Sequence, residues 1–105
     1  KINCGNYLVV EHNGDIYPCD FFVKSEWKLG NIMETSFEEL FKISKEKFGN
    51  KKSNLNEKCL KCEWNYICHG GCLKYRFFNN DNSDFFCESY KTFFKHSIDK
   101  LKKLL

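Results

Sequence analysis

Seven cysteines in a chain of 105 residues are the side chains most able to do chemistry. Thiolates bind metal ions and iron–sulfur clusters, and thiols pair as disulfides. A closed disulfide framework needs an even number of cysteines, so this chain would leave one unpaired. The first residues hold no initiator methionine and no apolar signal segment. We therefore expect a cytoplasmic fragment of a larger protein, with reduced thiols.

The spacing of the cysteines leaves zinc and iron–sulfur chemistry open. Cys59-x2-Cys62 is the spacing of a zinc knuckle, and His69 is a further candidate ligand. A four-iron cluster instead takes its thiolates from a short stretch of chain and one remote cysteine. Cys59, Cys62 and Cys68 form such a stretch. The full order is Cys4-x9-Gly14-x4-Cys19, then Cys59-x2-Cys62-x5-Cys68-x3-Cys72, then Cys87.

Charge and hydropathy argue against two classes of partner. The chain has 17 Lys and Arg against 14 Asp and Glu, a net charge of +3, and Arg76 is its single arginine. So small an excess does not indicate nucleic-acid binding, for which arginine is the favoured base-reading side chain. Because no apolar run reaches the roughly 18 residues of a membrane span, we expect no membrane segment.

The first element that positions cysteines is a predicted β-hairpin over residues 7–18. The pair Asn13-Gly14 stands between two apolar runs, which favours a two-residue type I′ turn. Pairing across that turn places Cys19 at the level of Leu8, near the first thiol of the chain. The hairpin therefore gathers two of the seven thiols.

Two helices are predicted. Ser36 followed by Glu39 is a capping box that begins a helix over Phe37–Phe48. Residues 21–31 are predicted to be irregular and residues 58–72 to consist of tight turns, so the hairpin and helices together make an α+β fold. The second helix is C-terminal, amphipathic and about 17 residues long. Its apolar face consists of Tyr90, Phe93, Phe94, Ser97, Ile98, Leu101 and Leu105.

The pattern of seven cysteines resembles the SPASM domain, a C-terminal extension of many radical S-adenosylmethionine enzymes that modify peptides. The resemblance covers about residues 4–87. Three further segments resemble anaerobic sulfatase-maturating enzymes and the related arylsulfatase regulators. They are Tyr17-Pro18-Cys19-Asp20-Phe21-Phe22, Leu29-Gly30-Asn31-Ile32 and Cys68-His69-Gly70-Gly71-Cys72.

The resemblance implies that residues 1–105 form one auxiliary-cluster domain with two [4Fe–4S] clusters, downstream of a radical S-adenosylmethionine core. Cys4, Cys19 and Cys72 would hold the first cluster, whose fourth cysteine lies a few residues upstream of the position of Cys4 in sulfatase-maturating members. Here that ligand either precedes this sequence or is replaced by an open iron site. Zinc could replace a cluster in an isolated fragment. We also expect Trp64 and Tyr66 to shield the second cluster from solvent. The implied ligands of this second cluster are Cys59, Cys62, Cys68 and Cys87.

The resemblance further implies an oxidoreductase that converts a Cys or Ser of a sulfatase to formylglycine. A deoxyadenosyl radical would take hydrogen from Cβ of that residue, Asp20 would accept the thiol or hydroxyl proton, and the clusters would take an electron. The C-x3-C-x2-C motif of the S-adenosylmethionine site and its third cluster is missing, so this piece alone should be inactive. Three alternatives stay open: a maturase that crosslinks ribosomal peptides, a zinc-bound interaction module, and a structural Asp20 that only forms a turn.

Overall fold

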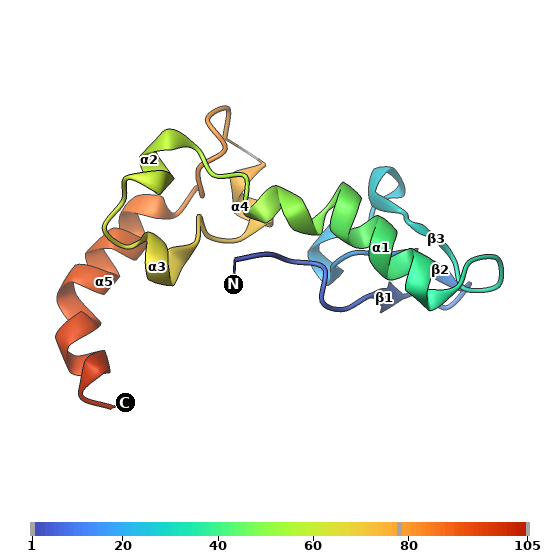
Figure 1. Cartoon of the computed structure of the whole chain (residues 1–105), viewed down its shortest axis with the longest axis horizontal. Coiled ribbons are helices and arrows are strands. Elements are labelled where there is room, and N and C mark those ends of the chain that lie inside the picture. The colour runs from blue at the N-terminus through green and yellow to red at the C-terminus, as the bar shows by residue number, and fades with distance from the viewer. Residues whose placement is uncertain (1, 78, 105) are drawn as a thin grey trace. The chain divides into compact units, whose positions relative to one another are not determined.

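The computed structural model describes residues 2–77 and 79–104. The chain divides into two compact units, Lys1–Asn54 and Leu55–Leu105 (Figure 1). The first unit contains a three-stranded sheet and one α-helix, and the second contains four α-helices. The α+β class predicted from the sequence is confirmed.

The sheet of the first unit is antiparallel, with the strand order β1-β2-β3. The strands are β1 (Val9–Val10), β2 (Asp15–Tyr17) and β3 (Gly30–Asn31). The hairpin of β1 and β2 is confirmed. The segment before β3 was predicted to be irregular, but it contains two short 3-10 helices, η1 (Asp20–Phe22) and η2 (Ser25–Trp27).

The hairpin turn is one residue longer than predicted. The N–H of Glu11 donates to the carbonyl of Asp15 and the N–H of Gly14 donates to the carbonyl of Glu11, both at 2.9 Å. The turn therefore spans residues 12–14 and ends in Gly14, whose φ of +88° is left-handed. This is the three-residue hairpin turn, a type I turn followed by a left-handed glycine, and not the predicted type I′ turn.

The longer turn shifts the register by one residue. Val9 pairs with Tyr17, and extending that pairing brings Tyr7, and not Leu8, opposite Cys19. Because neighbouring residues of a strand point to opposite faces, the shift exchanges which side chain meets the cysteine.

The strand β3 is the element of the first unit that the sequence did not predict. Gly and Asn are poor strand formers, so the pairing comes from tertiary contacts and not from propensity. The Asn31 side chain donates to Asp15 Oδ1 at 3.0 Å, and the N–H of Ile32 donates to the carbonyl of Gly14 at 2.8 Å.

The helix α1 (Phe37–Lys47) begins where it was predicted and ends one residue earlier. Ser36 Oγ accepts a hydrogen bond from the N–H of Glu39 at 3.3 Å, which is the expected N-cap. Leu40 is completely buried against β3, since a Cβ built on Gly30 would lie 3.2 Å from Leu40 Cδ2. A further 3-10 helix, η3 (Gly49–Lys52), follows α1.

Three aromatic rings fill the rest of this core. Phe22 and Phe48 are buried, with ring centroids 4.9 Å apart, and Trp27 packs edge-on against both at 5.1 Å and 5.7 Å. Edge-to-face packing at these distances is favourable beyond the apolar area that it buries. The segment between β2 and β3 is thereby held on the same core as α1.

The second unit consists of helices. Residues 58–72 were predicted as tight turns, and the structure instead has two one-turn helices there, with a third directly after. The helix α5 confirms the predicted C-terminal helix, although Leu105 lies outside the described residues. No helix in residues 2–77 and 79–104 is long and apolar enough to cross a membrane. The helices are α2 (Glu57–Leu60), α3 (Asn65–Cys68), α4 (Leu73–Arg76) and α5 (Cys87–Lys102).

Candidate metal centre

Four cysteines of the second unit line one cavity of about 250 Å³. Cys59 lies on α2, Cys62 follows that helix, Cys68 is the last residue of α3 and Cys87 is the first of α5. The structure therefore brings together the four thiols that were predicted to hold the second cluster.

Local hydrogen bonds position two of these cysteines. Asn56 caps α2, with Oδ1 accepting from the N–H of Cys59 at 2.8 Å. The N–H of Trp64 donates to Cys62 Sγ at 3.4 Å. Hydrogen bonds to cysteine sulfur are among the features that tune iron–sulfur clusters.

Glycine and aromatic side chains complete the wall of the cavity. Gly70 lines it with a φ of +79°, and a Cβ there would lie 2.5 Å from Leu55 Cδ2. A larger side chain there would have to displace the end of the Leu55 side chain, in a backbone conformation that side chains rarely adopt. Trp64 and Phe94 also line the cavity, with ring centroids 5.7 Å apart, as expected for a shield against solvent.

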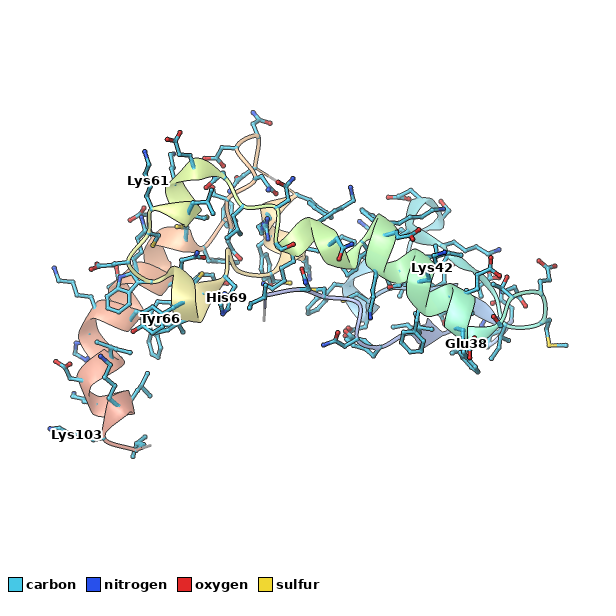
Figure 2. The ribbon with its side chains drawn as sticks, in the orientation of Figure 1. Glu38, Lys42, Lys61, Tyr66, His69 and Lys103 are labelled. Carbon is cyan, nitrogen blue, oxygen red and sulfur yellow. The ribbon has the colours of Figure 1, made fainter. Side chains whose placement is uncertain are left out.

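Two further residues that were predicted to act at the centre, Tyr66 and His69, do not line the cavity. Tyr66, on α3, is not among the residues lining the cavity and is 60% exposed, so the prediction that it shields the centre is wrong. His69 lies at the C-terminal end of α3 in a left-handed conformation and is also not among the lining residues (Figure 2). The candidate zinc ligand therefore does not line the cavity of the four thiols.

The cavity disfavours ionised thiols. Burial raises the pKa of the Cys59 thiol, negative charge on Cys87 raises it further, and the Arg76 guanidinium lowers it. Burial likewise raises the pKa of Cys87, against the effect of the Lys91 ammonium. Metal ligation requires thiolates, so a bound positive centre would have to offset this cost.

The donors that line the cavity fit a four-iron cluster. Within residues 2–77 and 79–104 no group of three or more His, Cys, Asp or Glu side chains is placed to hold one metal ion. Four thiols instead surround a cavity of about 250 Å³. A four-iron cluster needs one thiolate per iron and occupies the space between them, so these residues fit that group.

The other three cysteines are divided between the two units. Cys4 and Cys19 belong to the first unit, where the N–H of Cys4 donates to the carbonyl of Gly49 at 3.2 Å. Cys72 belongs to the second unit and directly precedes α4, with its N–H donating to Asp84 Oδ2 at 3.1 Å.

A tyrosine that the sequence analysis missed contacts the candidate base. Asp20 is exposed at the start of η1, and Tyr7 Oη donates to its Oδ1 at 2.7 Å. The same Oη lies 3.4 Å from Cys19 Sγ. The hydrogen bond with Cys19 and then that with Asp20 raise the pKa of Tyr7, so its hydroxyl keeps its proton. The three-residue turn would have revealed this pairing, because it sets Tyr7 opposite Cys19.

Comparison with known proteins agrees with this geometry. A family model described as "SPASM: Iron-sulfur cluster-binding domain" matches residues 3–63. A "cysteine-type anaerobic sulfatase-maturating enzyme" of Clostridium perfringens (strain 13) is 38% identical over 102 residues, covering 93% of this chain. A "serine-type anaerobic sulfatase-maturating enzyme" of Bacteroides thetaiotaomicron is 35% identical over 112 residues, covering 98%. This chain spans only 28% and 27% of those two relatives.

Solved structures match as well. The structure "Native anSMEcpe with bound AdoMet and Kp18Cys peptide" superposes with a TM-score of 0.85 at 35% identity, over 97% of this chain and 29% of that one. The same protein with AdoMet and the Cp18Cys peptide gives a TM-score of 0.86 at 36% identity, over 97% of this chain and 30% of that one. The family match covers more than half of the chain and includes the hairpin and the first two cysteines of the cavity. This chain belongs to the SPASM family of iron–sulfur cluster-binding domains.

Proposed function

We propose that this chain is the auxiliary-cluster part of a radical S-adenosylmethionine enzyme that oxidises a Cys or Ser of a sulfatase to formylglycine. The cavity lined by four cysteines carries the proposal, because it offers one thiolate to each iron of a four-iron cluster. Sequence relatives named as cysteine-type and serine-type sulfatase-maturating enzymes support the choice of reaction.

Seven thiols divide between two proposed clusters. The cavity cysteines 59, 62, 68 and 87 hold the second cluster, and Cys4, Cys19 and Cys72 hold the first. When bound, each cluster supplies a one-electron acceptor. Thiolate ligation of this kind persists in a reducing compartment, which supports a cytoplasmic enzyme.

Asp20 is the proposed general base. For a substrate cysteine, one hydrogen atom would leave Cβ for a radical made in the core, and the thiol proton would pass to the Asp20 carboxylate. A bound cluster would supply the acceptor for the one remaining electron. The product is a thioaldehyde, which water converts to the formylglycine aldehyde with release of hydrogen sulfide. The exposed position of Asp20 at the start of η1 allows a peptide to reach it.

The S-adenosylmethionine site belongs to a core domain of the same protein, which is the proposed partner of this piece. The chain has no C-x3-C-x2-C motif, and a solved structure similar to it contains AdoMet and a peptide in a chain more than three times as long. The proposed substrate is accordingly a peptide or protein segment with the Cys or Ser motif of a sulfatase.

Anaerobic turnover of the full-length protein tests the proposal. With S-adenosylmethionine, a reductant and a sulfatase Cys peptide, mass spectrometry should detect formylglycine in that peptide. No product there, with turnover of a peptide encoded near the gene, would favour a peptide-crosslinking maturase instead. Iron and sulfide analysis completes the test, because stoichiometric zinc without iron or sulfide would contradict the cluster assignment.

A further inference from the structure

The single arginine of the chain is completely buried beside the cysteine cavity. Arg76 is the last residue of α4, and its exposed fraction is 0%. A guanidinium stays protonated under all ordinary conditions, so a full positive charge is held inside the second unit. Burying a charge is costly unless nearby negative charge compensates it.

The guanidinium lies directly behind one wall of the cavity. A Cβ built on Gly70 would lie 3.3 Å from Arg76 Nη1 and 3.5 Å from Cζ, and Gly70 itself lines the cavity. Gly70 has no side chain, so the guanidinium packs close to the backbone of this cavity-lining residue.

Other charged groups around the cavity are screened more strongly. The Lys58 and Lys91 side chains are 82% and 44% exposed and pair with Asp81 and Glu88. Water and salt weaken the field of such groups far more than that of a buried one.

Asp84 is the buried charge of opposite sign on the cavity wall. Its carboxylate accepts the N–H groups of Cys72 at 3.1 Å and of Phe86 at 2.7 Å. These backbone dipoles offset part of its negative charge. Arg76 is therefore a fixed positive charge beside the cavity that solvent screens little.

We propose that Arg76 raises the reduction potential of the second cluster, an inference that rests on the proposed four-iron cluster in this cavity. A cluster with four thiolates carries a net charge of about −2 when oxidised and about −3 when reduced. A fixed cation stabilises the reduced state more than the oxidised one, since attraction grows with the charge. Arg76 thereby makes the cluster a better electron acceptor.

Redox titration of the full-length, anaerobically purified protein tests this role. The signal of the second cluster is identified as the paramagnetic component that the Cys87→Ala variant lacks. In Arg76→Met and Arg76→Gln the ratio of reduced to oxidised cluster at a given potential should fall about tenfold. For a one-electron couple that is a midpoint about 59 mV lower. Arg76→Lys should keep a midpoint near that of the wild type, because it keeps the charge.

Lys74→Met is the matched control. Lys74 lies on the same helix and loses the same charge, but its side chain is only partly buried, so water screens its charge more than that of the fully buried Arg76. The midpoint potential of the second cluster should be the same in Lys74→Met as in the wild type. Unchanged midpoints in both neutral Arg76 variants, or an equal fall in Lys74→Met or Arg76→Lys, would overturn the proposal.

The proposal can still be tested if Arg76→Met and Arg76→Gln do not retain the second cluster. If they lose its iron and sulfide, the proposal requires Arg76→Lys to keep the cluster and its potential. Loss in Arg76→Lys as well would mean that the planar guanidinium is needed for shape and not for charge. A wild-type protein without this cluster would overturn the proposed function itself, whereas a present cluster with an insensitive potential overturns only the role of Arg76.

Discussion

At the scale of single residues, the Tyr7 hydroxyl contacts both the candidate base and a candidate cluster ligand. Its Oη lies 2.7 Å from Asp20 Oδ1 and 3.4 Å from Cys19 Sγ. If Cys19 is a deprotonated cluster ligand, both neighbours only accept, and the shorter bond to the carboxylate is the stronger one. Tyr7 thus orients the candidate base beside a candidate cluster ligand.

Replacing the base should abolish most of the turnover. Asp20→Asn keeps the size of the side chain but cannot accept the substrate proton, so formylglycine formation should fall by about 100-fold or more. Mass spectrometry measures the product, while iron and sulfide content should equal those of the wild type. Asp99→Asn, on the exposed part of α5, is the matched control and should be neutral. Full turnover by Asp20→Asn would show that Asp20 only forms a turn and is not the general base.

Tyr7 should act through Asp20. Tyr7→Phe removes only the hydroxyl, and a hydrogen bond to a charged group contributes about 1.5–3 kcal/mol, so kcat should fall about tenfold or more. Tyr66→Phe makes the same change at an exposed tyrosine outside the cavity and should be neutral.

A double-mutant cycle separates positioning from general damage. In the Asp20→Asn background the loss of the Tyr7 hydroxyl should have little further effect on kcat, because its acceptor has lost its charge and its role. Additive losses in the double variant would show that Tyr7 does not work through Asp20.

At the scale of elements, the hairpin shows what a local pattern can predict. Asn13-Gly14 between apolar runs correctly predicted two paired strands, but two turn types suit the same residues. The longer turn leaves the left-handed conformation to Gly14 alone. The choice depends on contacts with β3, through Asn31 and Ile32, that lie far along the chain. The register, and with it the Tyr7–Asp20 contact, therefore could not be read from the hairpin segment.

Among the helices too, some could be predicted from their local sequence and others depend on contacts with distant residues. The helix α1 has its own capping signal and a periodic apolar face, so its prediction was accurate. The one-turn helices α2, α3 and α4 are too short to show any period. Gly70 lines the cavity. The burial of Arg76 behind it, however, arises from folding that no local pattern describes.

The cap of α1 should contribute measurably to stability. Ser36→Ala removes the acceptor of the Glu39 N–H, and loss of such a cap costs about 1 kcal/mol. Urea unfolding followed by circular dichroism should show a lower midpoint with an unchanged slope. Ser36→Asp should restore the midpoint, since its carboxylate also caps the helix. Ser25→Ala, at an exposed serine in η2, is the control, and an equal loss there would contradict the capping role.

At the scale of the whole molecule, the two units differ in what holds them together. The first unit buries Ile16, Phe22, Leu40 and Phe48. Among residues 55–77 and 79–104, Leu73 is the one buried apolar side chain. The centre of that unit is instead the cavity between the four thiols. Ligand bonds to a cluster would then supply the stability that apolar burial supplies in the first unit.

Removal of iron should therefore unfold the second unit and leave the first one folded. After anaerobic chelation of the full-length protein, hydrogen exchange measured by mass spectrometry should become fast in α3, α4 and the start of α5. Amides of α1 and β2 should keep their protection, because their core contains no cluster ligand. A Cys59→Ser/Cys62→Ser variant should show the same pattern without chelator, which separates loss of the cluster from effects of the reagent. Protection that persists in α3 to α5 after complete loss of iron would show that these helices fold without the metal. The cavity would then form before the cluster binds. The cluster would serve electron transfer in this unit but contribute no folding free energy.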